Sequence, residues 1–181
     1  MIAIEELRDD TKYYGKFGKQ YLSNSDIGTL LNNPTQFGQP RDTTLPMILG
    51  RYFHTLMLEP EKIKDFKICE ASTRTTNIFK DLVKDFDRDN IVLSKEDEQM
   101  RFLTSEINLF FNELIYDKDN KFEEPAIGEI GGVMWKGKAD IVTRDLIVDL
   151  KTSGDIDNFK YSARKYNYDS QAWVYNQLFG K

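Results

Sequence analysis

Two aspartates and a lysine around residue 150 have types and spacing that could bind a divalent metal. Residues 138–151 read Lys-Ala-Asp-Ile-Val-Thr-Arg-Asp-Leu-Ile-Val-Asp-Leu-Lys, which contains Asp140, Asp149 and Lys151. The aliphatic runs on either side of Thr-Arg-Asp predict two strands joined by a tight turn. Because side chains alternate along a strand, Asp149 and Lys151 should share one face.

The length of the turn decides whether the two aspartates meet. A two-residue loop at 144–145 would set Asp140 directly opposite Asp149. Opposed side chains lie about 5 Å apart at Cβ, and two like charges there are destabilising unless a cation lies between them. A divalent metal supplies that charge, and Lys151 supplies part of it. The alternative is a half-buried strand with a solvated Asp–Lys pair, because Asp-x-Lys occurs by chance in many chains.

Apolar periodicity predicts four helices that could position or cover these residues. Their ranges are 21–34, 46–58, 94–116 and 170–179. The second helix carries His54, the only histidine of the chain, on one face with Phe53 and Met57. A histidine among apolar residues is more often a hydrogen-bonded core residue than a ligand, so the pattern alone leaves both interpretations open.

Strand signals precede the acidic stretch. Residues 126–130 and 133–142 are largely apolar and flank Gly131-Gly132, which is typical of a hairpin turn. With the strand that leads to Asp149, they form a three-stranded meander. We therefore predict an α/β (α+β) fold, in which a central mixed sheet containing the meander is flanked by helices.

Composition indicates one globular domain and excludes several classes of protein. The 181 residues are 40% hydrophobic and 30% charged, and no apolar run approaches the length of a membrane span. The single cysteine, Cys69, excludes a disulfide framework or a cysteine-rich zinc site. A net charge of −5 argues against coating nucleic acid by bulk charge. We expect a cytoplasmic protein with an extended or loop lead-in at 1–20 and one domain over 21–181.

The motifs in their order resemble the RecB-like branch of the PD-(D/E)XK nucleases, and most closely the RecE-type (exodeoxyribonuclease VIII) exonuclease domain of phages and prophages. The resemblance covers about Leu22 to Gly180. The residues that carry it are Gly50, Phe53-His54, Leu58-Glu59-Pro60, Asp140, Asp149-Leu-Lys151-Thr152, Asp155-Ile-Asp-Asn-Phe159, Gln171 and Tyr175.

The resemblance implies a restriction-endonuclease-like core and a role for each of these residues. The Mg²⁺ ligands would be His54, Asp140, Asp149 and the carbonyl of Leu150, and Mn²⁺ would be able to substitute. Lys151 would orient or deprotonate the attacking water, and Gln171 would orient the lysine, the water or the phosphate. A further acid usually lies near the start of the meander; Glu124 fits best, followed by Glu129. Candidate DNA contacts are Arg51, Arg74, Lys160, Arg164, Lys165 and Tyr175, of which Tyr175 could instead pack.

The function implied by the resemblance is 5′-to-3′ exonuclease activity on double-stranded DNA ends in phage-type recombination. A metal-activated water would attack the phosphorus and leave a 5′ phosphate. Expected partners are a single-strand annealing protein and further copies of the chain in a ring, in a bacterial or phage-infected cell. The alternatives are a structure-specific endonuclease and a non-catalytic DNA-end-binding module. Because only six residues follow Tyr175, we expect a domain truncated at its C-terminus.

Overall fold

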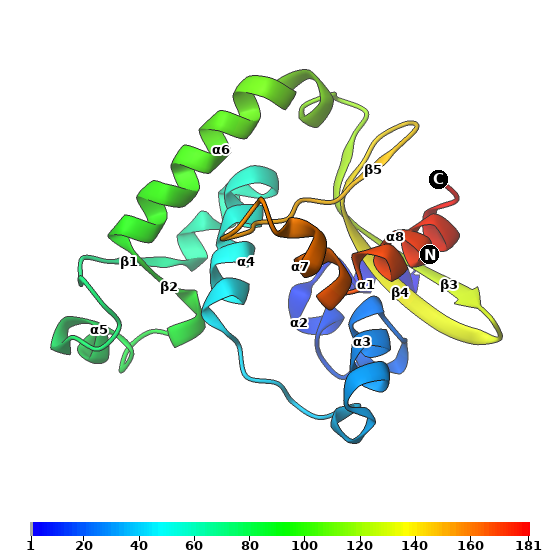
Figure 1. Cartoon of the computed structure of the whole chain (residues 1–181), viewed down its shortest axis with the longest axis horizontal. Coiled ribbons are helices and arrows are strands. Elements are labelled where there is room, and N and C mark those ends of the chain that lie inside the picture. The colour runs from blue at the N-terminus through cyan, green and yellow to red at the C-terminus, as the bar shows by residue number, and fades with distance from the viewer. Residues whose placement is uncertain (1) are drawn as a thin grey trace. The chain divides into compact units, whose positions relative to one another are not determined.

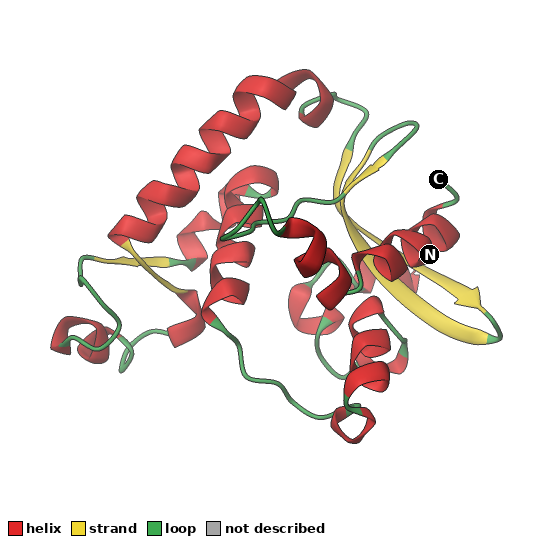
Figure 2. Cartoon of the chain, viewed as in Figure 1, coloured by secondary structure: helices red, strands yellow, loops and turns green. Residues whose placement is uncertain are grey.

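The computed structural model describes residues 2–181, which divide into two compact units. The sheet unit comprises Met1–Pro40, Asp119–Asp149 and Ser153–Lys181, and the helical unit comprises Arg41–Lys118 and Leu150–Thr152. Both units combine helices with strands (Figure 2), which confirms the predicted α+β class. The strands form two separate sheets, one antiparallel and one parallel, rather than one mixed sheet.

The sheet unit is built on the predicted antiparallel meander. Its strands are β3 (Lys121–Ile130), β4 (Val133–Val142) and β5 (Ile147–Val148), in that spatial order (Figure 1). Gly131 and Gly132 join β3 to β4 with φ angles of 61° and 80°, which favour glycine. β3 begins earlier than the predicted residue 126. It includes Pro125, which is tolerated because β3 is an edge strand of this sheet.

Residues 2–20 form short helices joined by turns, rather than the expected extended or loop lead-in. They form α1 (Ile2–Glu6), α2 (Asp10–Tyr13) and the 3₁₀ turn η1 (Gly18–Gln20). Burial of Leu7 and Tyr13 explains why this segment folds onto the unit. The Asp9 carboxylate caps α2 by accepting a hydrogen bond from the Thr11 amide at 2.8 Å.

The remaining helices of the sheet unit include one that the sequence did not predict. They are α3 (Asn24–Asn32), the 3₁₀ turn η2 (Pro34–Gln36), α7 (Phe159–Lys165) and α8 (Tyr168–Phe179). α8 starts two residues before the predicted 170 and contacts both β3 and β4. α7 was not predicted because seven residues are too few to show an apolar stripe.

The helical unit pairs its two long helices, α4 (Leu45–Leu58) and α6 (Ser94–Ile115), side by side (Figure 1). The pattern at 46–58 and 94–116 is therefore confirmed almost to the residue. The other elements are β1 (Lys67–Cys69), β2 (Ile91–Leu93), α5 (Asn77–Leu82) and the 3₁₀ turns η3 (Pro60–Asp65) and η4 (Arg88–Asn90). β1 and β2 pair in parallel, and Ile91 and Leu93 of β2 share a buried cluster with Phe79 of α5.

Candidate metal centre and its supports

The register of the meander brings the two predicted aspartates together. Ile141 pairs with Val148, and the Thr143 amide donates to the Leu146 carbonyl at 2.9 Å across the two-residue loop. This confirms the predicted loop at 144–145. Continuing the register by one residue sets Asp140 of β4 opposite Asp149, which directly follows β5.

A third carboxylate faces Asp140 from the other neighbouring strand. The pairs Phe122–Ile141 and Glu124–Ala139 leave Glu123 directly opposite Asp140. Carboxylate oxygens of Glu123 and Asp140 lie within 4.8 Å of one another. The register therefore arranges Glu123, Asp140 and Asp149 as one acidic row across three adjacent strands.

The backbone at Glu123 has an unusual conformation. Its φ of 45° is one of only two positive values at non-glycine residues within 2–181. A left-handed backbone at a residue with a side chain costs about 1–3 kcal/mol, and such strain often marks a functional position. Its neighbours on both sides, Phe122 and Glu124, pair regularly with β4.

The two glutamates proposed from the sequence lie elsewhere. Glu124 forms an ion pair with Arg8 at 2.6 Å and lies 3.7 Å from the ammonium of Lys121. Glu129 is exposed and pairs with Met134 near the hairpin turn. At about 3.4 Å per residue, Glu129 lies about 20 Å along β3 from Glu123. The acid that sequence reasoning missed is thus Glu123, one residue before the favoured candidate.

The chemistry of the acidic row fits a hard divalent cation. The row presents three carboxylates, and oxygen ligands are those preferred by Mg²⁺ and Mn²⁺. Asp140 is buried, with 7% of its surface exposed, so its charge is poorly screened by water. Opposed carboxylates on neighbouring strands repel unless a cation lies among them. A metal would therefore relieve a repulsion that the register of the sheet imposes.

Helix α8 holds the acidic row from the side. The Gln171 amide donates to the Asp149 carboxylate at 3.0 Å, and the Tyr175 hydroxyl donates to the Lys138 carbonyl at 2.7 Å. Burial is the main cause that raises the pKa of Tyr175 above its usual value, and the charges of Asp140 and Asp149 raise it further. This hydroxyl is engaged by β4, so of the two roles considered for Tyr175, packing is the one that the contacts support.

In the helical unit, α4 holds the segment that contains the predicted lysine. His54 Nε2 lies 3.1 Å from the Leu150 carbonyl oxygen, and a Cβ added at Gly50 would lie 3.8 Å from Thr152 Oγ1. Gly50 and His54 are one helical turn apart, so one face of α4 follows the segment Leu150–Thr152. This segment includes Lys151 and continues directly from Asp149.

The distance between His54 and Leu150 is also compatible with metal coordination. Two neighbouring ligands of an octahedral Mg²⁺ or Mn²⁺ at about 2.1 Å from the ion are about 3 Å apart. A carbonyl oxygen only accepts hydrogen bonds, so the contact at 3.1 Å requires a proton on Nε2. Coordination through Nε2 would require that proton to leave this nitrogen.

Two predicted DNA contacts have partners that argue against the role. Arg51 donates to the Asn90 side chain at 2.7 Å, and its guanidinium lies 5.2 Å from the centroid of the Phe66 ring. Arg74 pairs with Glu96 at 2.8 Å, and both side chains are largely buried. These guanidiniums therefore stabilise the helical unit. By contrast, Lys160, Arg164 and Lys165 are all exposed on α7.

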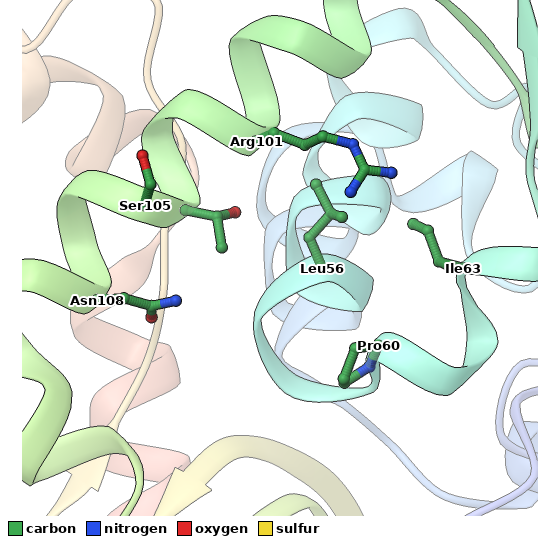
Figure 3. Close-up of a pocket in the computed structure, with 7 residues that line it drawn as sticks. Leu56, Pro60, Ile63, Arg101, Ser105 and Asn108 are labelled. Carbon is green, nitrogen blue, oxygen red and sulfur yellow. The ribbon is translucent and has the colours of Figure 1, made fainter.

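A pocket of about 400 Å³ lies between α4 and α6 in the helical unit (Figure 3). Its labelled lining residues are Leu56, Pro60, Ile63, Arg101, Ser105 and Asn108. Its lining also includes Thr104, whose buried hydroxyl has no hydrogen-bond partner among the described residues. The lining contains no carboxylate and none of the predicted site residues.

Opposed acids on a meander that leads into Asp-x-Lys match the sequence motif of PD-(D/E)XK domains. A family model described as "PDDEXK-like domain of unknown function (DUF3799)" matches residues 29–181, and the chain belongs to this family. A search of curated proteins gave no match. Within residues 2–181, every helix is too short or too polar to cross a membrane.

Proposed function

We propose that the chain is a metal-dependent deoxyribonuclease that acts as an exonuclease on double-stranded DNA ends. The observation that carries this proposal is the acidic row: Glu123 and Asp140 lie opposite each other on β3 and β4, and Asp149 lies opposite Asp140 directly after β5. Lys151 follows Asp149 by two residues. Membership of a PDDEXK-like family supports the same chemistry, because these domains are related to nucleases by fold and motif.

The proposed metal ligands follow the resemblance, with one replacement. Asp140 and Asp149 retain the roles implied by the resemblance, as do His54 and the Leu150 carbonyl, and Glu123 replaces Glu124 as the further acid. When bound, Mg²⁺ or Mn²⁺ would supply positive charge that lowers the pKa of a water and stabilises the oxygens of the attacked phosphate. The separation of 3.1 Å between His54 Nε2 and the Leu150 oxygen supports their assignment as neighbouring ligands.

Lys151 and Gln171 have supporting roles in the proposed hydrolysis. Lys151 would hold the attacking water and take or share its proton, so that hydroxide character develops next to the phosphorus. Gln171 would fix the rotamer of Asp149 through the hydrogen bond of 3.0 Å. Water would add to the phosphorus as the bond to the sugar 3′ oxygen breaks, leaving a 5′ phosphate.

The finer parts of the proposal come from the resemblance to RecE-type exonucleases. They are the 5′-to-3′ direction, a role in phage-type recombination, a single-strand annealing partner and assembly into a ring. A duplex labelled on either the 5′ or the 3′ strand tests the direction by the order in which labelled nucleotide is released. Mass measurement in solution tests the ring, and co-purification with an annealing protein encoded nearby tests the partner.

Digestion of linear duplex DNA tests the core of the proposal. We expect degradation in Mg²⁺ or Mn²⁺, none in EDTA, and none by Asp149→Asn or Lys151→Ala in either metal. Glu129→Gln is the matched control, because this exposed glutamate lies near the hairpin turn and should leave the rate unchanged. Intact linear DNA with folded wild-type protein in both metals would refute the proposal.

The same assay distinguishes the two alternative functions. Cleavage of closed circles would favour the endonuclease alternative, and binding without cleavage would favour an end-binding module.

A further inference from the structure

An aromatic ladder extends from the helix that holds Asp149. It consists of Phe159, Tyr168 and Tyr166: the Phe159 and Tyr168 ring centroids lie 5.9 Å apart, and those of Tyr168 and Tyr166 lie 6.0 Å apart. The two tyrosine rings are nearly parallel, at 27° to one another. Phe159 and Tyr168 are half-buried, whereas Tyr166 is 55% exposed, so the ladder ends in an accessible ring.

The middle ring of the ladder, Tyr168, lies next to the proposed metal centre. Tyr168 and Gln171 are three residues apart on α8, which places their side chains on the same face of the helix. Gln171 donates to Asp149 at 3.0 Å. Burial, followed by the charge of Asp149, raises the pKa of Tyr168, consistent with a ring close to that carboxylate.

The corner between α7 and α8 holds the ladder in place. Asn167 has a left-handed backbone, with φ of 53°, and this conformation turns the chain sharply between Tyr166 and Tyr168. The Asn167 carbonyl accepts hydrogen bonds from the Ser170 hydroxyl at 2.9 Å and from the Asn24 amide at 3.3 Å. A fixed corner lowers the entropic cost of presenting Tyr166 to a ligand.

Positive charge accompanies the ladder in an otherwise acidic chain. The basic trio of Lys160, Arg164 and Lys165 lies on α7 and is exposed. Within the described residues, no ion pair joins any of the three to a carboxylate. Residues 156–168 contain these three cations and one acid, Asp157, in a chain whose net charge is −5. Local positive charge beside exposed rings is the pattern that binds single-stranded nucleic acid.

We propose that the aromatic ladder and the basic trio form a platform for the unpaired end of a DNA strand. An unpaired base stacks on the exposed ring of Tyr166, displacing the Lys165 ammonium that lies 5.3 Å from the ring centroid, and the basic trio contacts the adjoining phosphates. This proposal identifies the strand that the proposed nuclease would bind, and it therefore rests on the proposed function. A base stacked at the end of the ladder would direct its strand toward Asp149. A closed base pair buries the faces of its bases, so the platform should favour a frayed or single-stranded end.

Binding measured without cleavage tests the platform separately from the nuclease proposal. The probes are fluorescein-labelled dT₁₂, U₁₂ and a blunt duplex of 12 base pairs, titrated in EDTA and read by anisotropy. We expect dT₁₂ to bind more tightly than either the duplex or U₁₂. Tyr166→Ala should weaken dT₁₂ binding about 5- to 150-fold, the range found when a stacking ring is removed. Tyr166→Phe should retain binding because the ring remains.

Two further variants separate stacking from charge and from general surface effects. Phe110→Ala removes a ring that is 75% exposed on α6 and should leave dT₁₂ binding unchanged. Replacing the basic trio with glutamine should reduce the salt slope of binding by about 2, since single strands contribute about 0.7 per neutralised phosphate. The proposal is overturned if wild type does not bind dT₁₂ or if Tyr166→Ala binds it as tightly as wild type. It is also overturned if Tyr166→Phe loses as much affinity for dT₁₂ as Tyr166→Ala does. Tighter binding of U₁₂ would overturn the choice of DNA.

Discussion

Glu123 combines two unfavourable features in one residue: a left-handed backbone and a negative charge opposite Asp140. Each feature lowers the stability of the folded chain, and yet both are present. This suggests that Glu123 has a role that a regular strand residue at this position would not perform. Its neighbour Glu124 has a simpler role, because Arg8 already balances its charge in an ion pair of 2.6 Å. The two adjacent glutamates therefore offer a direct comparison.

We predict that Glu123→Gln lowers Mn²⁺ affinity and DNA cleavage about tenfold or more, because one carboxylate of the acidic row loses its charge. Glu124→Gln should change each by less than about twofold, since this carboxylate pairs with Arg8. Calorimetric titration of Mn²⁺ and initial cleavage rates at saturating metal provide the two measurements. The assignment of Glu123 is wrong if Glu124→Gln proves to be the more damaging change.

Burial of Lys136 makes the free energy of unfolding depend on pH. It is buried, its ammonium lies 4.1 Å from the centroid of the Tyr13 ring, and burial is the main cause that lowers its pKa from 10.5 to about 8. Between these values the unfolded chain binds the proton and the folded chain has released it. The free energy of unfolding therefore rises with pH across this window as far as Lys136 contributes.

We predict that Lys136→Met is more stable relative to wild type below pH 8 than at pH 10, because the variant lacks the cost of burying a charge. Urea denaturation of both proteins at pH 7, 8, 9 and 10 gives the difference in the free energy of unfolding. Lys160→Met, at an exposed position of α7, should show a difference independent of pH below 9. A constant difference for Lys136→Met across the series would contradict the lowered pKa.

At the scale of elements, the contact of α8 with β4 positions the acidic row. A Cβ added at Gly137 would lie 2.9 Å from Tyr175 and 3.0 Å from Leu178, which is closer than side chains normally pack. The absence of a side chain at Gly137 therefore lets α8 come close enough for the Tyr175 hydroxyl to reach the Lys138 carbonyl. The same approach brings Gln171 to Asp149.

We predict that Gly137→Ala lowers the free energy of unfolding by about 1–3 kcal/mol, because the added methyl overpacks this contact. Cleavage should fall as well, since α8 also carries Gln171. Gly154→Ala is the control: an added Cβ there meets nothing within 4 Å, and the change should be close to neutral. Urea denaturation at neutral pH measures both variants. A neutral Gly137→Ala would mean that the close packing does not determine where α8 lies.

The elements also show what the sequence could and could not predict. The opposition of Asp140 and Asp149 was predictable because it depends on local alternation and a two-residue loop. Glu123 was missed although a signal existed: it lies eight residues before Gly131, as Asp140 lies eight after Gly132. The predicted strand started at 126 because charged residues and Pro125 interrupt the apolar run. Counting back from the turn by the same number of residues that separates it from Asp140 would have identified Glu123.

Contacts between distant segments had weaker signals. Only the family resemblance suggested that His54 and Leu150 act together, and no local pattern predicts that α4 follows the segment Leu150–Thr152. No sequence pattern predicted the aromatic ladder either, because the ladder depends on the left-handed backbone of Asn167 between two short helices. Asparagine tolerates this conformation better than most residues, but the sequence does not require it there.

At the scale of the whole molecule, the acidic row should make stability depend on divalent metal. A ligand that binds only the folded state stabilises it by about 2.7 kcal/mol at 100 times its Kd. We predict that saturating Mn²⁺ raises the Tm of wild type by about 5–10 °C. Asp140→Asn should lose most of that rise, and it should be at least as stable as wild type in EDTA because a buried, repelled charge is removed.

Differential scanning in EDTA and in Mn²⁺ makes this comparison. Asp145→Asn is a suitable control, since this exposed aspartate lies in the loop between β4 and β5 and pairs with Arg144. Its Tm should rise with Mn²⁺ as much as that of wild type. Equal Tm values for wild type with and without Mn²⁺ would contradict a metal centre on the acidic row.

The pairing of β3 with β4 has a genetic consequence. One codon inserted between Gly131 and Gly132 would slide β3 by a single position past its neighbour, and Glu123 would then no longer stand across from Asp140. The lesion would lie about 27 Å from the carboxylates, at the far tip of the hairpin. Such a protein could still be expressed and soluble yet be inert, as if an active-site residue had been deleted.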